Sequence, residues 1–316
     1  MRIKFWGVRG SIPTPASSIQ IKEKIFAILK EIPDNALKSK SSIIDFVNKL
    51  DNVYTGVIGG NTSCIELRVN DKFIIFDMGT GIRVLGSYIM KNGLYDMIKE
   101  FHIFLSHTHW DHIMGFPFFA PAHFPKTKLF FYSVHPDLEE RLRIQQDFRF
   151  FPVSLDHMAS EKTFIKLDPE SEIDIEGVKI KNKALYHPGG SYGFRVVYED
   201  KIFVYATDSE FKNSTKNGNE KYIEFFKNAD VLVFDAQYTF EEAVHKEDWG
   251  HSSALIGVDF SIAAKVKKLV LFHHEPERND FEIYSVYKKA TDYKNINYPK
   301  SDLEILLAYE GLTIDI

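Results

Sequence analysis

The sequence predicts a single α/β domain in which helices cover β-sheets, and three observations lead to this fold class. Short apolar runs typical of strands recur along the whole chain, some continuous and some alternating with polar residues. Helical patterns occur between them in both halves, which favours one layered domain over separate helical and sheet domains. Several strands end at a polar residue able to bind a metal, and α/β proteins commonly carry their chemistry on such loops.

The elements follow from these patterns. We expect strands at residues 2–6, 63–69, 72–77, 101–106, 129–132, 178–186, 193–199, 202–207, 230–235, 268–273 and 304–308. We expect helices at about 19–31, 41–50, 82–92, 137–146, 220–228, 252–266 and 280–292. No repeat, low-complexity tract or linker is visible, so one domain should span residues 1–316. Residues 16–55 form a mostly helical insertion between two glycine-rich loops, either a cap over a site or a surface decoration.

Composition and charge limit the classes of partner. The formal net charge is -5 and no basic stripe is visible, so a long nucleic acid is not favoured as a partner. A small anionic substrate stays open, because bound metals can supply local positive charge. No run approaches the roughly 20 apolar residues of a membrane span. The N-terminus lacks an apolar signal region, so we expect a cytoplasmic protein that does not insert into a membrane.

One short motif carries most of the functional information: His107-Thr108-His109-Trp110-Asp111-His112. Residues i and i+2 of an extended segment point the same way, so two imidazoles can converge on one metal. Asp111 and His112 then offer a carboxylate and a third imidazole to a neighbouring metal. Two adjacent metals activate water and stabilise both the attacking and the leaving oxygen. The motif therefore predicts a metal-dependent hydrolase.

Three further residues stand alone at the ends of predicted strands and complete the set. His187 precedes Pro188-Gly189-Gly190, Asp208 ends Val204-Tyr205-Ala206-Thr207, and His273 ends Val270-Leu271-Phe272. Each is weak by itself, because a lone histidine is usually a polar residue with an ordinary partner. His274 faces the opposite way along the strand from His273, so only one of the two should be a ligand.

In these motifs the sequence resembles the metallo-β-lactamase superfamily of metal-dependent hydrolases, over nearly the whole chain. It is most similar to the branch with ribonuclease Z and the phosphonate-pathway cyclic phosphodiesterase, and to relatives that open with Gly7-Val8-Arg9-Gly10-Ser11-Ile12-Pro13. The resemblance implies an αββα sandwich of two central sheets flanked by helices, with the metals at one edge. It assigns His107, His109 and His187 to one metal, Asp111, His112 and His273 to the other, and Asp208 to both.

Two further matches narrow the branch. Phe234-Asp235-Ala236-Gln237 resembles the acidic motif of ribonuclease Z, with Asp235 where that enzyme has Glu. Trp249-Gly250-His251-Ser252 resembles its Gly-His-Ser motif. The resemblance implies that His251 protonates the leaving group and that Asp235 orients His251. Asp77 resembles a carboxylate that holds a metal-bound histidine, with a turn-forming role as the alternative. Arg9 could clamp a phosphate or form an ordinary salt bridge.

We therefore expect a dinuclear metal-dependent phosphodiesterase with Asp111, Asp208, His251 and Asp235 as its catalytic residues. Zinc is favoured for both ions, with manganese or iron as alternatives. The sequence shows no segment resembling the arm by which ribonuclease Z grips tRNA, which favours a small or cyclic phosphodiester or a nucleotide. A homodimer is common in that branch.

Other functions stay open. A lactone or thioester hydrolase would use the same metals. A di-iron oxidoreductase of this fold would resemble His-x-Glu-x-Asp-His, with a carboxylate at the place of His109. A non-catalytic metal-binding module is the third alternative. The aromatic group Phe116, Phe118, Phe119, Phe148, Phe150 and Phe151 is expected mainly in the core, although part of it could line a pocket on which a base stacks.

Overall fold

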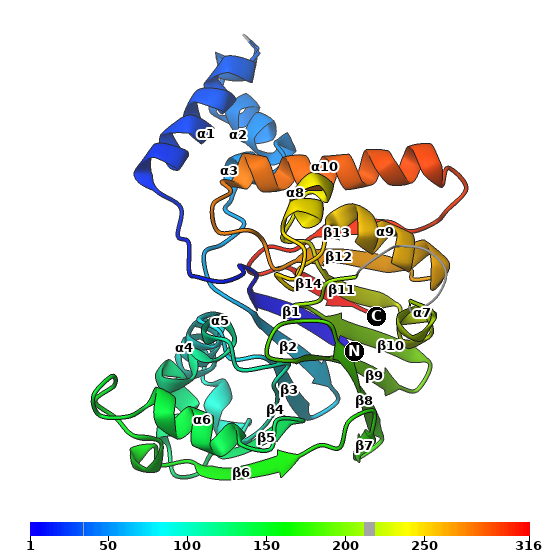
Figure 1. Cartoon of the computed structure of the whole chain (residues 1–316). Coiled ribbons are helices and arrows are strands. Elements are labelled where there is room, and N and C mark those ends of the chain that lie inside the picture. The colour runs from blue at the N-terminus through cyan, green and yellow to red at the C-terminus, as the bar shows by residue number, and fades with distance from the viewer. Residues whose placement is uncertain (34, 212–218) are drawn as a thin grey trace.

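The computed structural model describes residues 1–33, 35–211 and 219–316 and shows two sheets packed face to face between outer layers of helices (Figure 1). Each sheet has seven strands. The predicted αββα sandwich is therefore confirmed. Among the described residues, no helix is long and apolar enough to cross a membrane.

The first sheet is built mainly from the N-terminal half of the chain and has the order β14-β1-β2-β3-β4-β5-β6. Its strands are β1 (Arg2–Gly7), β2 (Cys64–Val69), β3 (Lys72–Phe76), β4 (Glu100–Phe104), β5 (Lys128–Ser133), β6 (Glu161–Lys166) and β14 (Thr313–Asp315). The strands from β14 to β3 pair antiparallel, and those from β3 to β6 pair parallel. The parallel strands β3 and β4 therefore end at the same edge of the sheet.

The second sheet repeats this arrangement with the order β13-β12-β11-β10-β9-β8-β7. Its strands are β7 (Glu172–Ile175), β8 (Val178–Leu185), β9 (Ser191–Tyr198), β10 (Lys201–Ala206), β11 (Val231–Asp235), β12 (Lys268–Phe272) and β13 (Glu304–Leu307). The pairs from β7 to β10 are antiparallel and those from β10 to β13 are parallel. Strands β8, β10, β11 and β12 consequently run in one direction.

The core is layered like the fold. Between the sheets, the rings of Phe194, Phe203 and Tyr205 surround Phe76 with centroids 5.4–5.8 Å away. All four are fully buried, and each such side chain contributes about 1.5–3 kcal/mol relative to exposure. Two further apolar clusters complete the core, one between the first sheet and its outer helices and one between the second sheet and its outer helices. The two sheets thus form a rigid base for the loops at their edge.

The helices that cover the sheets are α4 (Gly81–Lys91), α5 (Trp110–Ile113), α6 (Leu138–Gln145), α7 (Glu220–Phe226), α8 (Phe240–His245), α9 (Ala254–Ala263) and α10 (Asp280–Asn297). Short 3-10 turns lie at Leu94–Asp96, Phe116–Phe118, Ala120–His123 and Leu155–His157. Helices α4, α5 and α6 lie on the first sheet, and α7, α9 and α10 on the second (Figure 1).

The N-terminal helices lie outside these layers. They are α1 (Ser18–Glu31), a 3-10 turn at Ala36–Lys38, α2 (Lys40–Lys49) and α3 (Asn52–Thr55). Figure 1 shows α1 and α2 projecting beyond α10, away from both sheets. Lys24 is the one buried residue of α1, and α2 buries none. Lys24 Nζ lies 2.6 Å from Asp280 Oδ2 at the start of α10, so an ion pair anchors the projecting segment at its base.

Several short elements and part of the aromatic group differ from the prediction. Strands β6, β7 and β14 were not predicted, because they are short edge strands without a continuous apolar run. The short helices α3, α5 and α8 are likewise too brief to show a helical period. Phe116 and Phe119 are in the core as expected, but Phe118, Phe148 and Phe150 are exposed, so the prediction of a mainly buried group is wrong for these three.

Candidate metal centre

Six strands end at one edge of the sandwich, and the residues at or just after their ends meet there. These residues are Asp77 after β3, His107 after β4, His187 after β8, Asp208 after β10, Asp235 at the end of β11 and His273 after β12. The motif at 107–112 continues from β4 through an extended His109 into α5. Residues more than 150 positions apart in the sequence therefore meet in one cluster.

The backbone turns sharply where three of these residues leave their strands. Asp77, Asp208 and His273 have φ values of 60°, 52° and 60°. The left-handed region is uncommon for residues other than glycine and costs on the order of 1–3 kcal/mol for most side chains. The same left-handed backbone turn at three strand ends directs each side chain over the sheet edge instead of along the strand.

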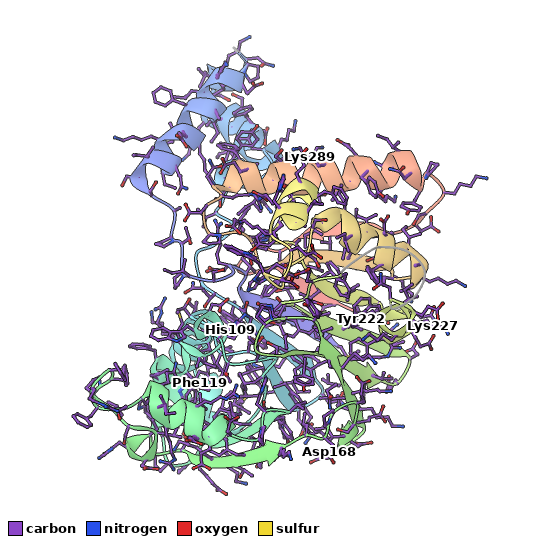
Figure 2. All side chains as sticks on the ribbon, viewed as in Figure 1. His109, Phe119, Asp168, Tyr222, Lys227 and Lys289 are labelled. Atoms are coloured by element: carbon purple, nitrogen blue, oxygen red, sulfur yellow. The ribbon has the colours of Figure 1, made fainter. Side chains whose placement is uncertain are left out.

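His107, His109 and His187 form what we call the first half of the cluster. One nitrogen from each lies within 4.8 Å of the others. His187 Nε2 is 3.0 Å from His109 Nδ1, the closest approach among them. His107 and His187 are buried, whereas His109 is exposed, so the cluster opens to solvent beside His109. Figure 2 shows His109 next to α5, on the opposite flank of the molecule from Tyr222 and Lys227.

Asp111, His112, Asp208 and His273 form the second half. His112 Nε2 lies 3.2 Å from both Asp111 Oδ2 and Asp208 Oδ2. His273 Nε2 lies 3.1 Å from Asp111 Oδ2 and 3.3 Å from Asp208 Oδ1. Asp208 Oδ1 is also 3.8 Å from His107 Nε2 and 3.9 Å from His187 Nε2. Asp208 is therefore the residue that both halves share.

These donors fit divalent metal ions. Two ligand atoms that each lie about 2.1 Å from one tetrahedral zinc are roughly 3.4 Å apart, close to the separations within each half. His107 Nε2 is buried and has no hydrogen-bond partner among the described residues. A buried imidazole nitrogen without a partner is costly unless something binds it. Nitrogen and carboxylate donors in this mixture suit zinc, manganese or iron.

The outer nitrogens of the buried histidines are held by acceptors. His112 Nδ1 donates to Asp77 Oδ2 at 2.8 Å and His187 Nδ1 to the Gly250 carbonyl at 2.8 Å. His273 Nδ1 donates to Gln237 Oε1 at 2.9 Å, and His107 Nδ1 lies 3.0 Å from Ser106 Oγ. A proton fixed on the outer nitrogen leaves the inner lone pair free to bind a metal.

Asp77 is the centre of this supporting network. Besides His112, its carboxylate accepts from the Ser106 backbone N–H at 2.8 Å and the Ser106 hydroxyl at 2.7 Å. It also accepts from the Tyr205 hydroxyl at 2.7 Å. The geometry thus gives Asp77 the supporting position that the resemblance implies. Ser106, Tyr205 and Gln237 were not singled out from the sequence, because only their tertiary neighbours reveal their role.

The two halves differ in charge. Burial, followed by the proximity of His112, lowers the pKa of His107 well below its ordinary value, and burial also lowers the pKa of His109 and His187. Burial would also lower the pKa of His273, but Asp208 and Asp111 outweigh it and raise the value to about 9. Burial would raise the pKa of Asp111, yet His112 and His273 hold it well below the ordinary range.

A histidine–carboxylate pair stands beside both halves. His251 Nδ1 lies 2.8 Å from Asp235 Oδ2, so the carboxylate of the short Asp235 side chain reaches the ring. Asp235 Oδ1 also accepts from the Gln237 backbone N–H at 3.0 Å, which fixes the carboxylate. The His251 ring centroid is 5.1 Å from those of His187 and His273. One His251 nitrogen lies within 4.8 Å of donors on His187 and Asp208.

The N-terminal loop borders the second half and does not supply a phosphate clamp. Arg9 is buried, and its guanidinium donates to the Gly59, Glu275 and Arg278 carbonyls and to Asp280. Of the two roles considered for Arg9, the structure shows the salt bridge, with Asp280, and not the phosphate clamp, because all three guanidinium nitrogens already have protein partners. The Ser11 backbone N–H instead donates to Asp111 Oδ2 at 2.8 Å.

His274 lies on the other side of the β12 end from the cluster. Its Nε2 donates to the Ala308 carbonyl at 2.9 Å, and burial lowers its pKa to about 3. It therefore stays neutral and structural, while His273 faces the donors. The Cβ of an alanine at Gly10 would lie 2.5 Å from the His273 ring, so close packing of the loop requires glycine there.

Comparison with known proteins gives one consistent result. The beta-lactamase superfamily domain matches residues 74–274, well over half of the chain. Ribonuclease Z from Picrophilus torridus is 25% identical over 271 residues, covering 71% of this chain and 84% of that protein. Two crystal structures share the fold: YhfI from Bacillus subtilis (17% identity, TM-score 0.64, 99% and 98% coverage) and human tRNase Z, short form (18%, 0.61, 100% and 99%).

These relatives correct one expectation. A long nucleic acid was not favoured on the basis of the net charge, yet the similar curated proteins are ribonucleases and one structural neighbour is a tRNase. The charge argument failed because a whole-chain sum of -5 says little about the field at a metal-binding edge. With its fold, its donor cluster and the match over residues 74–274, the chain belongs to the metallo-β-lactamase superfamily.

Proposed function

We propose that the protein is a dinuclear metal-dependent phosphodiesterase. The observation that carries this proposal is the His251–Asp235 pair, with 2.8 Å between its nitrogen and oxygen, beside two donor sets between which Asp208 lies. The donor sets alone support a metal-dependent hydrolase. The added pair supports a reaction in which a strongly basic leaving group must be protonated, as in the hydrolysis of an alkyl phosphodiester.

Each half would hold one ion: His107, His109 and His187 the first, and Asp111, His112 and His273 the second, with Asp208 between them. When bound, two divalent ions neutralise charge on phosphoryl oxygens and lower the pKa of a water toward neutrality. Asp77, Gln237, Ser106 and the Gly250 carbonyl keep the imidazoles oriented. The Ser11 N–H donates to Asp111 Oδ2, the oxygen that also faces His112 and His273, and so holds this carboxylate in place.

In phosphodiester hydrolysis a water oxygen bonds to phosphorus and the bond to the leaving oxygen breaks. The departing alkoxide is basic and leaves slowly unless it receives a proton. His251 Nδ1 is engaged by Asp235, so its other ring nitrogen is the one available to donate that proton. Asp235 fixes the direction of the ring through its hydrogen bond to Nδ1.

Other reaction classes have less support. A thioester could use the same donors, but a thiolate leaving group has little need of the His251–Asp235 pair. A lactone also expels an alkoxide, and the substrate screen below separates it from a phosphodiester. A di-iron oxidoreductase is disfavoured because His109 contributes an imidazole where that group has a carboxylate. The donors are complete among the described residues, which does not favour a catalytically silent module.

The test compares leaving groups. In His251→Ala, metal content should stay at the wild-type level. Turnover of a dinucleotide, whose leaving group is an alkoxide, should fall about 10²–10⁴-fold. Turnover of bis-p-nitrophenyl phosphate should fall far less, because p-nitrophenolate leaves without protonation. His245→Ala, which removes an exposed histidine of α8, is the control. Equal losses on both substrates would refute the proton-donor role.

A substrate screen decides the reaction class. It should include bis-p-nitrophenyl phosphate, cyclic nucleotides, a tRNA precursor, lactones and thioesters. We expect activity on phosphodiesters. Activity confined to lactones or thioesters would contradict the proposal.

A further inference from the structure

The three tryptophans fall into two classes. Trp6 is buried, and its Nε1–H donates to Glu66 at 2.7 Å. Trp110 and Trp249 are 78% and 62% exposed. A tryptophan used for packing buries its large ring and finds a partner for its N–H, as Trp6 does. Tryptophan is enriched at binding interfaces, where its apolar ring is covered by a partner.

Both exposed tryptophans adjoin residues of the metal centre. Trp110 is the first residue of α5, directly between His109 and Asp111. Because His109 is itself exposed, Trp110 lies at the side where the cluster opens to solvent. Trp249 directly precedes Gly250, whose carbonyl accepts from His187 Nδ1, and is two residues from His251. The two exposed tryptophans therefore adjoin residues of the cluster along the chain, one at the start of α5 and the other in the loop before His251.

The backbone that carries Trp249 is held in place. The Gly250 N–H donates to Glu210 Oε2 at 3.0 Å, and the Trp249 N–H donates to the Lys246 carbonyl at 3.2 Å. The Lys246 ammonium lies 5.6 Å from the centroid of the Trp249 ring. A flat ring on a fixed loop can stack on a base with little loss of conformational entropy. The nearby ammonium of Lys246 adds positive charge beside this ring.

We propose that Trp110 and Trp249 stack on nucleobases that flank the scissile phosphate, so that the substrate is a phosphodiester bearing at least one base. This inference rests on the proposed function and deepens it. An aromatic ring accepts any base, because every base has a π-face, whereas the metals hold the phosphate. The two rings are then positioning residues, and they separate nucleotide substrates from alkyl phosphodiesters.

The test uses two substrates that share a leaving group. Thymidine 5′-p-nitrophenyl phosphate carries a base, and ethyl p-nitrophenyl phosphate does not. Because the thymidine ester carries one base, only the ring on that side of the phosphate contacts it. In either Trp110→Ala or Trp249→Ala, the preference for the thymidine ester, as a ratio of kcat/KM values, should fall roughly five- to 150-fold, mainly through KM. Trp110→Phe and Trp249→Phe should retain most of the preference, because an aromatic face remains.

Phe26→Ala is the matched control, since Phe26 is 73% exposed but lies on the projecting helix α1. It should leave the preference unchanged. If both tryptophan variants lower the two esters equally, the rings support the metal centre and the inference is overturned. An equal loss in Phe26→Ala would also overturn it.

A second measurement does not depend on turnover. Thymidine 5′-monophosphate should quench the tryptophan fluorescence of the wild-type protein, and the double variant Trp110→Phe, Trp249→Phe should lose most of this quenching. If the wild type cleaves neither ester but is quenched, the proposed function fails and base stacking stands. Absence of quenching in the wild type overturns the inference whatever the activity.

Discussion

The two halves of the metal centre are built from the same kinds of loop but differ in charge and exposure. The first half consists of three imidazoles whose pKa values are lowered by burial, and one of them, His109, is exposed. All four residues of the second half are buried, and two of them are carboxylates. On the proposed dinuclear function, an ion in the first half would exchange more readily, whereas an ion in the second half would be held by the two carboxylates.

The two halves also differ in the hydrogen bonds that neighbouring residues make to them. Asp77, Gln237 and the Ser11 N–H all bond to residues of the second half. In the first half, His187 is held by a carbonyl and His107 contacts a hydroxyl, while His109 contributes the most exposed donor. A chelator should therefore remove the first-half ion first. The following predictions test this difference, beginning with the largest effect.

Asp208→Ala should affect both halves, because Asp208 is the donor that they share. We expect metal content to fall from about two ions per chain to less than one, and activity to fall on the order of 10³-fold or more. Elemental analysis beside a phosphodiesterase assay measures both. Asp259→Ala, which removes a carboxylate bonded to Tyr293 and Tyr298, is the control and should change neither. Retention of both ions in Asp208→Ala would show that Asp208 is not shared.

Asp77→Asn should weaken the second half selectively. The amide has one oxygen that accepts hydrogen bonds and one nitrogen that only donates them. The side chain therefore cannot accept the hydrogen bonds from His112, Ser106 and Tyr205 together. We expect a roughly 10- to 100-fold loss of affinity at the second half. Metal titration of Asp77→Asn in the His107→Ala background isolates that half. Asp230→Asn, a buried carboxylate remote from the cluster, should bind metal normally. Unchanged affinity in Asp77→Asn would exclude this supporting role.

The pH dependence of metal binding should also differ between the halves. In the metal-free protein the pKa of His273 is raised to about 9, so below pH 9 this ring carries a proton that a metal must displace. Second-half affinity should therefore rise with pH, about tenfold per unit for each proton released. First-half imidazoles, whose pKa values are lowered, should bind without proton release at pH 7.

Calorimetric titrations in buffers of different ionisation enthalpy count these protons. Asp111→Ala reports the first half and His107→Ala the second. Equal proton release from the two halves would contradict the assigned difference in charge.

Local pattern was enough to predict an α/β domain and to mark candidate donors at strand ends, whereas the αββα sandwich and the assignment of donors to two metals were implied by the family resemblance. An apolar run followed by His107, His187, Asp208 or His273 predicts both a strand and a polar side chain at its end. The supporting contacts were not predictable in this way. Tyr205 meets Asp77 only after the two sheets pack, and Gln237 meets His273 only across neighbouring strands. Positive φ at Asp77, Asp208 and His273 likewise arises from tertiary structure rather than from local preference.

The wrong expectation about nucleic acid and the open choice for Arg9 have a common cause. A long nucleic acid was disfavoured, and a phosphate clamp was one of two roles considered for Arg9, because charge was judged from residue type and total. In the structure the guanidinium of Arg9 already donates hydrogen bonds to backbone carbonyls and to Asp280. The distribution of charge in three dimensions, not its sum, determines which anions can approach the cluster.

The most direct test of the account is the number of metal ions per chain in the active protein, measured by elemental analysis while a chelator removes the metal stepwise. The account predicts two ions per chain at full phosphodiesterase activity, loss of activity as the first-half ion leaves, and recovery when zinc or manganese is restored. Full activity with one ion per chain, or with none, would contradict it.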